Sequence, residues 1–200
     1  MTDLALPEVV WRTPSWLAAE LDLDASYDDD DSKMGLVIDL ARRNVAHGGG
    51  PFGAAVFDAG TQRLVALGAN WVVAQKSSLL HAEIAAIAFA QLRVGSHSLA
   101  GGNHELFAGS EPCAQCLGAT AWSGVRRLVC GAPAEEAEAI GFDEGPRRTD
   151  WAAQLQARGI AVTLGLYAAE ARQVFRTYAA RGGPIYNALT ASARTWGSRR

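Results

Sequence analysis

The sequence is poor in cysteine, in long apolar runs and in excess positive charge, and each shortage excludes a class of protein. Three cysteines in 200 residues are few and odd in number, which argues against a disulfide framework and favours a reducing compartment. No apolar run reaches the roughly 18–20 residues of a membrane-spanning helix, and no basic segment precedes an apolar one as in a secretory signal. The net charge of −3 suits a nucleic-acid partner poorly. We therefore expect a cytoplasmic protein that binds neither membrane nor nucleic acid.

The composition does allow a folded domain, because 49% of the residues are apolar and only 20% are charged. The first part of the chain contains an acidic run, Asp28–Asp31, but also Trp11, Trp16 and Leu17, which indicate packing against a surface. Near the other end, Gly182-Gly183-Pro184 is typical of a hinge. The expected units are an N-terminal extension (1–31), one domain (32–181) and a C-terminal tail (182–200) that is a candidate active-site lid.

The spacing of apolar residues predicts the elements of this domain. A helix capped by Asp31 or Ser32 comes first, and two strands at 52–57 and 63–73 form a hairpin. Helices and strands then alternate, with helices at 79–94, 113–123, 134–139, 151–158 and 168–181 and strands at 105–108, 125–130 and 160–166. This order predicts an α/β fold, a three-layer α/β/α sandwich on a mixed sheet with the hairpin at one edge.

Two short segments carry the chemistry. His81-Ala82-Glu83 opens one predicted helix, and Pro112-Cys113-Ala114-Gln115-Cys116 opens the next. A helix N-terminus favours thiolates, and two thiolates with one imidazole form a three-ligand set for zinc that leaves a fourth position open, as in catalytic sites. Glu83 would lie beside this metal and accept a proton from the water that it activates.

Other interpretations of these residues remain open at this stage. A lone C-x-x-C pair is also typical of redox sites, and a structural zinc site would need a fourth ligand such as Cys130. Cys130 lies in an apolar strand, however, which favours a core position. His47, His97 and His104 lie near turns or strand ends and are not expected to bind a metal.

The two segments together match the H-x-E and P-C-x-x-C signature of zinc deaminases. The sequence resembles the cytidine-deaminase superfamily over roughly residues 33–188. Within this superfamily the sequence resembles the branch that holds bacterial guanine deaminases and tRNA adenosine deaminases. The segments that carry this resemblance are PFGAAVFD, HAEIAAI, SEPCAQCLGA and WSGVRRLVCGA. EAIGFDEGP and the later IYNA resemble the guanine deaminases, including those that act on the triazine ammeline.

This resemblance implies a five-stranded, cytidine-deaminase-like sheet and a role for each matching residue. Zn²⁺ would be held by His81, Cys113 and Cys116, and Glu83 would move protons from water to the ring and then to the departing amine. The base would be contacted by Asn70, by the backbone of Gly53 and Ala54, by Glu144 and by Tyr186, the last of which closes the pocket. The resemblance also implies a homodimer, with tails exchanged between subunits in several relatives.

Each of these roles has a structural alternative. Asn70 is also typical of a turn, Glu144 lies in an acidic segment that would be solvated by default, and Tyr186 lies close to a chain terminus. Trp122 and Phe142 fit either base stacking or packing, and Glu111 fits either a supporting hydrogen bond near the metal or a structural one. The sequence departs from its relatives at Gln115 and at Trp71, and Trp71 is expected near the pocket mouth, where it would affect the choice of base.

Deamination of free guanine to xanthine and ammonia is the leading functional hypothesis. Cytosine or a triazine is the alternative substrate within the same chemistry. Adenosine in tRNA is a further alternative, although it would need a basic surface. A zinc-binding module without catalysis is the alternative from another class.

Overall fold

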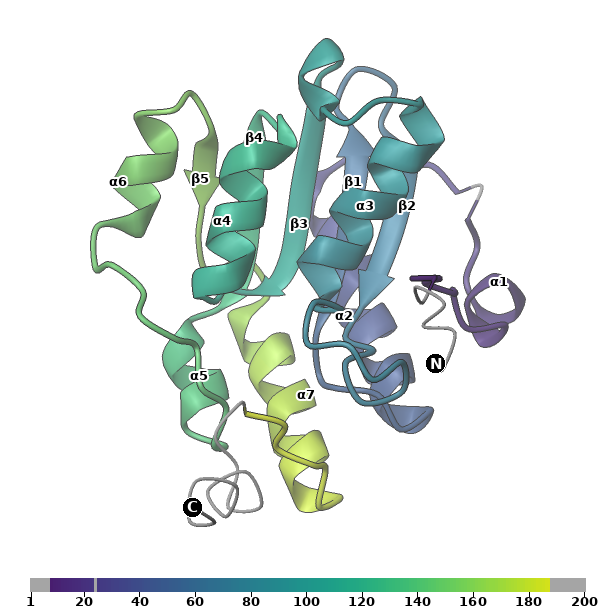
Figure 1. The fold of residues 1–200 in the computed structure, drawn as a ribbon, viewed down its shortest axis with the longest axis vertical. Helices are drawn as coiled ribbons and strands as arrows, with labels where there is room; N and C mark the ends of the chain where they lie inside the picture. Colours follow the sequence, from purple (N-terminus) through teal and green to yellow (C-terminus); the bar gives the residue numbers. More distant parts are fainter. Residues whose placement is uncertain (1–7, 24, 188–200) are drawn as a thin grey trace, which may run out of the picture.

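The computed structural model describes residues 8–187 except residue 24. Its centre is a five-stranded sheet with the strand order β2-β1-β3-β4-β5 (Figure 1). The bounds are β1 Gly53–Asp58, β2 Arg63–Ala69, β3 His104–Ser110, β4 Arg127–Ala132 and β5 Ala161–Thr163. β1 pairs antiparallel with both β2 and β3, whereas β3, β4 and β5 run parallel. The sheet is therefore mixed, with the hairpin at one edge, as the sequence predicts.

Helices cover both faces of the sheet, so the molecule is the expected α/β/α sandwich. The helices are α1 Trp16–Glu20, α2 Asp30–Ala46, α3 Ala82–Val94, α4 Ala114–Ser123, α5 Ala134–Glu138, α6 Trp151–Gln156 and α7 Ala168–Ala180, with a short 3₁₀ turn at Leu99–Gly101. Figure 1 shows α3 and α4 side by side over one face of the sheet, while α2 and α7 pack on the other. Within the described residues, no helix is long and apolar enough to cross a membrane.

β1 shows how the sequence builds the two apolar layers. Successive side chains of a strand point to opposite faces. Ala55 and Phe57 join the core under α2 and α7, whereas Ala54 and Val56 join the core under α3. Because both faces are covered, the strand is an almost continuous apolar run rather than an alternating one.

The first long helix begins earlier than predicted. Its N-cap is Asp29, not Asp31 or Ser32. The Asp29 side chain accepts a hydrogen bond from the Ser32 N–H at 2.7 Å, and the Ser32 hydroxyl lies 3.4 Å from the Asp29 N–H, which completes a reciprocal capping box. Ser32 is thus the third helical residue, and the acidic run supplies both the cap and the first turn, where negative charge is favourable.

The described part of the N-terminal extension packs on the domain, as its apolar residues predict. Leu17 of α1 is buried in the core beside α2. The Trp16 ring stacks on His47 with a centroid distance of 4.8 Å. The Gln75 side chain accepts from the Arg12 N–H at 3.0 Å and donates to the Arg12 carbonyl at 2.7 Å. The extension is thereby fastened to the segment that follows β2.

That segment, residues 70–81, is neither strand nor helix, although the prediction extended the second strand to 73 and began the helix at 79. Hydrogen bonds fold it into a loop: the Trp71 N–H donates to Leu80, and the Gln75 N–H donates to Trp71. The apolar residues of this stretch continue the apolar spacing of the flanking strand and helix, which is why the prediction extended both elements into the loop. His81 is consequently the N-cap of α3 rather than a residue within it.

Candidate active site

The strand directions bring the chemistry-bearing residues to one edge of the sheet. β2 and β3 each run antiparallel to β1, so they point the same way, and their carboxyl ends meet at the edge where β1 begins. Asn70 follows β2, Glu111 follows β3, and Phe52 precedes β1. All three line a cavity of about 290 Å³. Pockets for small ligands span about 300–1,000 Å³, so this cavity has the size for one small molecule.

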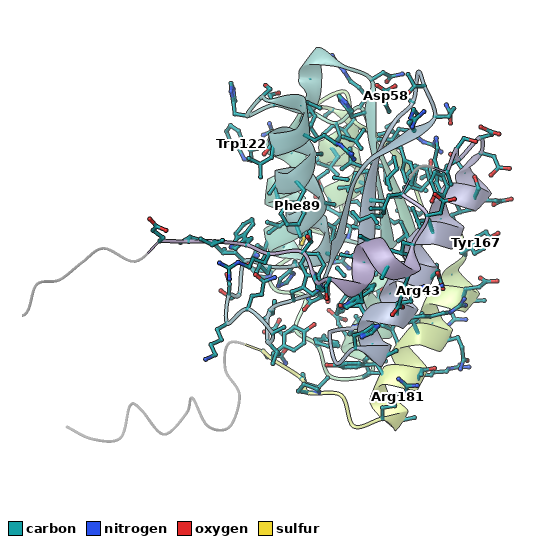
Figure 2. The ribbon with its side chains drawn as sticks, turned by 90° about the vertical axis from the view of Figure 1, so that its right-hand side faces the viewer. Arg43, Asp58, Phe89, Trp122, Tyr167 and Arg181 are labelled. Carbon is teal, nitrogen blue, oxygen red and sulfur yellow. The ribbon has the colours of Figure 1, made fainter. Side chains whose placement is uncertain are left out.

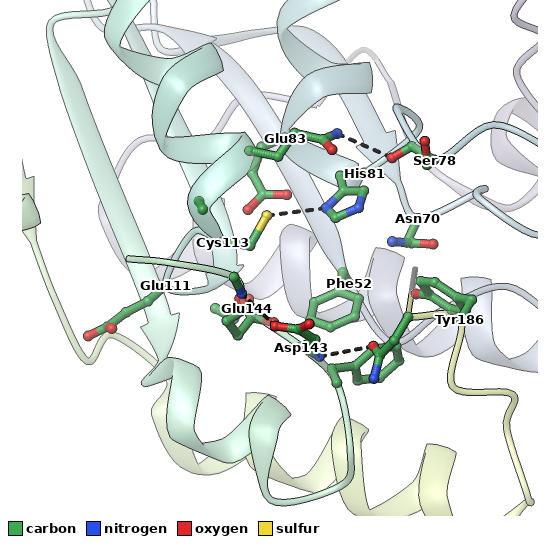
Figure 3. A pocket seen from close by; sticks show the side chains of 16 residues that line it. Phe52, Asn70, Ser78, His81, Glu83, Glu111, Cys113, Asp143, Glu144 and Tyr186 are labelled. Atoms are coloured by element: carbon green, nitrogen blue, oxygen red, sulfur yellow. Dashed lines mark hydrogen bonds between the residues drawn. The ribbon is translucent and has the colours of Figure 1, made fainter. Parts of the chain in front are cut away.

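His81, Cys113 and Cys116 come together at this cavity. The His81 Nδ1 lies 3.5 Å from the Cys113 Sγ and 3.6 Å from the Cys116 Sγ, and the three ligand atoms all lie within 4.8 Å of one another. His81 and Cys113, labelled in Figure 3, are the N-caps of α3 and α4. Cys116 lies in the first turn of α4. The two helix starts thus present all three groups to one point, as the spacing predicts.

This donor set fits a zinc ion. Thiolate sulfurs and an imidazole nitrogen are the usual ligands of zinc in proteins. A hydrogen bond from Cys116 lowers the pKa of Cys113 to about 4, despite burial, so one sulfur is already a thiolate at neutral pH. Among the described residues no further side chain joins this metal-ligand group. Cys130 is fully buried in β4 within the apolar core, as expected, and lies outside this group of three.

Glu83 stands beside the ligands in the first turn of α3. Its side chain lines the cavity and only 6% of the residue is exposed. Burial raises the pKa of Glu83, and the charge of Cys113 raises it further. A raised pKa makes this carboxylate a better proton acceptor than an exposed one, as a group that takes a proton from water requires.

Glu144 is a second buried carboxyl group in the same cavity, not a member of a solvated acidic loop. Only 7% of it is exposed. Burial raises the pKa of Glu144 to about 8, and the nearby charges of Cys113 and Glu83 act in the same direction. The Ala114 N–H donates to the Glu144 carbonyl at 2.9 Å, which fastens this residue to the start of α4. Asp143, the neighbour of Glu144, also lines the cavity, whereas Glu136 of the same segment pairs with Arg172 at 2.6 Å.

Asn70 is fixed with its amide nitrogen toward the cavity. The Val72 N–H donates to the Asn70 Oδ1 at 3.3 Å, and Figure 3 shows the amide nitrogen on the side of His81 and Phe52. Asn70 is 2% exposed and lines the cavity. The arrangement offers a hydrogen-bond donor to a ligand, which a simple turn residue would not.

Asn44 supports Asn70 and was missed by the sequence analysis. Its fully buried amide donates to the carbonyls of Gly50 at 2.8 Å and Asn70 at 2.9 Å, and it accepts from the Trp71 indole at 3.1 Å. The signal was present, because Asn44 lies seven residues after Val37 and three after Ala41, on the apolar stripe of its helix. A polar residue on a buried stripe must find hydrogen-bond partners.

Tyr186 covers the cavity from the tail. Its ring packs edge-on against Phe142 at a centroid distance of 5.0 Å. The Tyr186 hydroxyl is buried beside Gly50 and Asn70 and makes no hydrogen bond within the described residues. A β-carbon at Gly50 would overlap this hydroxyl, so the absence of a side chain at Gly50 leaves the space that the Tyr186 hydroxyl occupies. The remainder of the predicted tail, residues 188–200, lies outside the described residues.

Three expectations about the cavity wall are wrong. Gly53 and Ala54 are not among the residues that line it: a β-carbon at Gly53 would point to α2 and overlap the Val37 carbonyl, and Ala54 is buried under α3. Phe52, just before them, lines the cavity instead. Trp71 is not at the mouth, because its indole is turned into the core, where it bonds to Asn44.

The remaining aromatic and acidic candidates are also resolved. Trp122 is 81% exposed and projects from α4 (Figure 2), so it neither stacks on a ligand nor packs in the core. Phe142 lines the cavity. Glu111 forms an ion pair with Arg147 at 3.0 Å. The Arg147 guanidinium also lies over the Trp151 ring, 6.0 Å from its centroid. Gln115 reaches the Ser78 carbonyl at 3.2 Å and ties α4 to the loop before His81.

Comparisons with known proteins agree with this geometry. The profile of the family described as the cytidine and deoxycytidylate deaminase zinc-binding region matches residues 27–132, more than half of the chain. The structure is similar to that of guanine deaminase from Nitrosomonas europaea, with a TM-score of 0.83, 41% identity, and coverage of 86% of this chain and 97% of that one.

Two curated relatives carry names that describe an action on tRNA. One is tRNA(Ile)-lysidine synthase of Deinococcus deserti, 34% identical over 73% of this chain and 26% of its own length. The other is tRNA-specific adenosine deaminase of Haemophilus influenzae, 32% identical over 56% of this chain and 63% of its own length. The matched part of this chain thus spans about a quarter and about three fifths of these two relatives. On the family profile and the structural likeness together, the chain belongs to the cytidine and deoxycytidylate deaminase zinc-binding family.

Proposed function

We propose that this protein is a zinc-dependent aminohydrolase that converts free guanine to xanthine and ammonia. The observation that carries the proposal is the pair of buried carboxyl groups, Glu83 and Glu144, that line one small cavity together with two members of the metal-ligand group, His81 and Cys113. The likeness to the Nitrosomonas guanine deaminase over nearly its whole length supports the choice of guanine.

In this proposal His81, Cys113 and Cys116 hold the zinc. When bound, zinc supplies Lewis acidity that makes water a usable nucleophile at neutral pH. Glu83 takes one proton of the attacking water and passes it to the ring nitrogen next to C2. It then takes the second proton, from the hydroxyl group now on C2, and delivers it to the exocyclic amino group, whose bond to C2 breaks to release ammonia. The oxygen of water remains on C2 as the carbonyl of xanthine.

The other cavity residues bind and orient the base. The Asn70 amide nitrogen donates to an acceptor on the ring, and Glu144 contacts the ring edge and exchanges a proton with it. Phe52 and Phe142 give apolar walls, and Tyr186 closes the cavity and excludes water. The tail that lies over the cavity and the net charge of −3 both disfavour a base within a tRNA as substrate.

We propose further that the units are an extension over 1–31, the deaminase domain over 32–181 and a lid over 182–200. We also propose a homodimer in the cytoplasm. The exposed Trp122 on α4 and the exposed Leu92 on α3 lie on two adjacent helices and support an interface there. The described tail lies against the cavity of its own chain, and exchange of tails between two chains would keep the same contacts.

A panel of free bases tests the substrate. We expect ammonia release from guanine, and a loss of at least about a hundredfold in Glu144→Gln if this carboxyl group moves a proton in the reaction. Cytosine presents less ring to that side, so any turnover of cytosine should fall less. Zinc content should stay unchanged. Turnover of cytosine or a triazine without turnover of guanine would refute the choice of base but not the class of reaction.

Gly50→Ala tests whether Tyr186 must occupy the space beside Gly50 for the reaction to proceed. The added methyl group overlaps the Tyr186 hydroxyl, so we expect kcat/KM for guanine to fall by about tenfold or more, since a misplacement of about 1 Å can cost up to about a hundredfold. Adding Tyr186→Phe should restore part of this loss by removing the overlapping oxygen. Gly35→Ala is the matched control, because its methyl group would meet nothing within 4 Å. No loss in Gly50→Ala would mean that the tail does not close in this way.

A further inference from the structure

Asn187, the last described residue, joins the tail to the loop that carries Glu144. Its Nδ2 donates to the Gly141 carbonyl at 2.9 Å, and the Asp143 N–H donates to its Oδ1 at 2.9 Å. One amide group therefore bridges the backbone on both sides of Phe142. Figure 3 draws the bond at Asp143 as a dashed line.

The loop that carries Glu144 lacks regular secondary structure, so hydrogen bonds from other segments help to hold its backbone in place. It lies between α5, which ends at Glu138, and α6, which begins at Trp151. Gly141 and Gly145 have φ angles of 108° and 72°, in the region that favours glycine and allows alternative backbone paths. The Ala114 N–H holds the Glu144 carbonyl, and Asn187 holds the N–H of the residue before it. Local bonds also shape the loop, including the one from the Gly145 N–H to the Asp143 Oδ1 at 2.9 Å, but these two bonds fasten the backbone around Glu144 to α4 and to the tail.

Side-chain contacts couple the same two segments. Tyr186 packs on Phe142, and Ile185 lies near Gly141, so the tail contacts the loop through three successive residues. The tail residues that cover the cavity therefore also contact the loop that carries Glu144.

We propose that Asn187 is a positioning residue that holds the Glu144 loop in the geometry needed to contact the base. The inference rests on the proposed function, since it takes Glu144 as a group that touches the substrate. It gives the tail a second task besides covering the cavity.

Hydrogen exchange followed by mass spectrometry tests the bond itself, without reference to any substrate. In Asn187→Ala, the peptide that contains Asp143 should exchange faster than in the unaltered chain. Gln91→Ala is the matched control, because it also removes an exposed amide that bonds to a backbone carbonyl, that of His97 at 2.7 Å, far from the cavity. Both bonds of Asn187 are solvent-exposed, so the domain should remain folded. Unchanged exchange at Asp143 would overturn the proposal.

A double-mutant cycle then tests whether Asn187 acts through Glu144. Asn187→Ala should lower kcat/KM for guanine by about tenfold, the order expected for the loss of one or two net hydrogen bonds. In the Glu144→Gln background the same change should cost less than about twofold, because the group that it positions is already disabled. Equal losses in both backgrounds would overturn the proposal, since Asn187 would then act independently. If the unaltered chain does not deaminate guanine, the proposed function fails, and the exchange experiment alone decides whether Asn187 holds the loop.

Discussion

Replacing Glu83 with glutamine should lower guanine turnover by at least about a hundredfold while the zinc content stays unchanged. The substitution preserves the size of a side chain that is only 6% exposed, and it removes the oxygen that accepts the proton. Because Glu83 is not one of the three residues grouped around the metal position, the metal should remain bound. Ammonia release and metal analysis on the same sample measure both quantities.

Glu136→Gln is a suitable control for this experiment. Glu136 pairs with Arg172 on the surface near α7 and does not line the cavity, so its loss should leave turnover within about twofold of normal. A folded, zinc-loaded Glu83→Gln chain with near-normal turnover would remove Glu83 from the mechanism.

Replacing Cys113 with serine should reduce the zinc content from about one ion per chain to near zero. The hydroxyl of serine is a poor substitute for a thiolate whose pKa is lowered to about 4. Since a catalytic metal contributes several kcal/mol of transition-state stabilisation, turnover should fall by more than about a thousandfold.

Cys130→Ser provides the matched comparison for Cys113→Ser. Cys130 is fully buried in β4 and lies outside the metal-ligand group, so this chain should keep its zinc and lose only stability, because an unpaired hydroxyl replaces a thiol in the apolar core. Loss of zinc from a folded Cys130→Ser chain would make Cys130 a ligand and the site structural. Retention of zinc by Cys113→Ser would refute the assigned ligand set.

The sequence predicts the members of the metal-ligand group, with Glu83 beside them, because His81 with Glu83 and Cys113 with Cys116 are each a short local pattern. Each lies at or within the first turn of a helix, where a spacing of two or three residues already determines the relative directions of the side chains. The mixed sheet with the hairpin at one edge follows from the hairpin and from the alternation of helices and strands, whereas the strand order comes from the structure. The early start of α2 at Asp29 shows the limit of such reasoning, since several adjacent acidic residues are equally good caps and only the partner Ser32 selects one.

The residues that line the cavity are harder to predict, because the direction of each side chain depends on the helix or strand that packs against it. Trp71 follows Asn70 directly, yet its ring turns into the core, since Asn44, 27 residues earlier, supplies the hydrogen bond that a buried indole needs. Gly53 and Ala54 lie beside Phe52 in the sequence but face α2 and α3. These orientations depend on contacts between elements far apart in the chain, which periodicity does not encode.

The three metal-ligand residues have a consequence for the folding of the chain as well as for its chemistry. His81 precedes α3 and the cysteines open α4, with β3 between these helices, so the group assembles only when this crossover is folded. An ion that binds the folded chain but not the unfolded one raises the free energy of unfolding by RT ln(1 + [L]/Kd). The melting temperature is then a function of free metal concentration, and α3, β3 and α4 become the part of the molecule whose local opening a chelator would accelerate most.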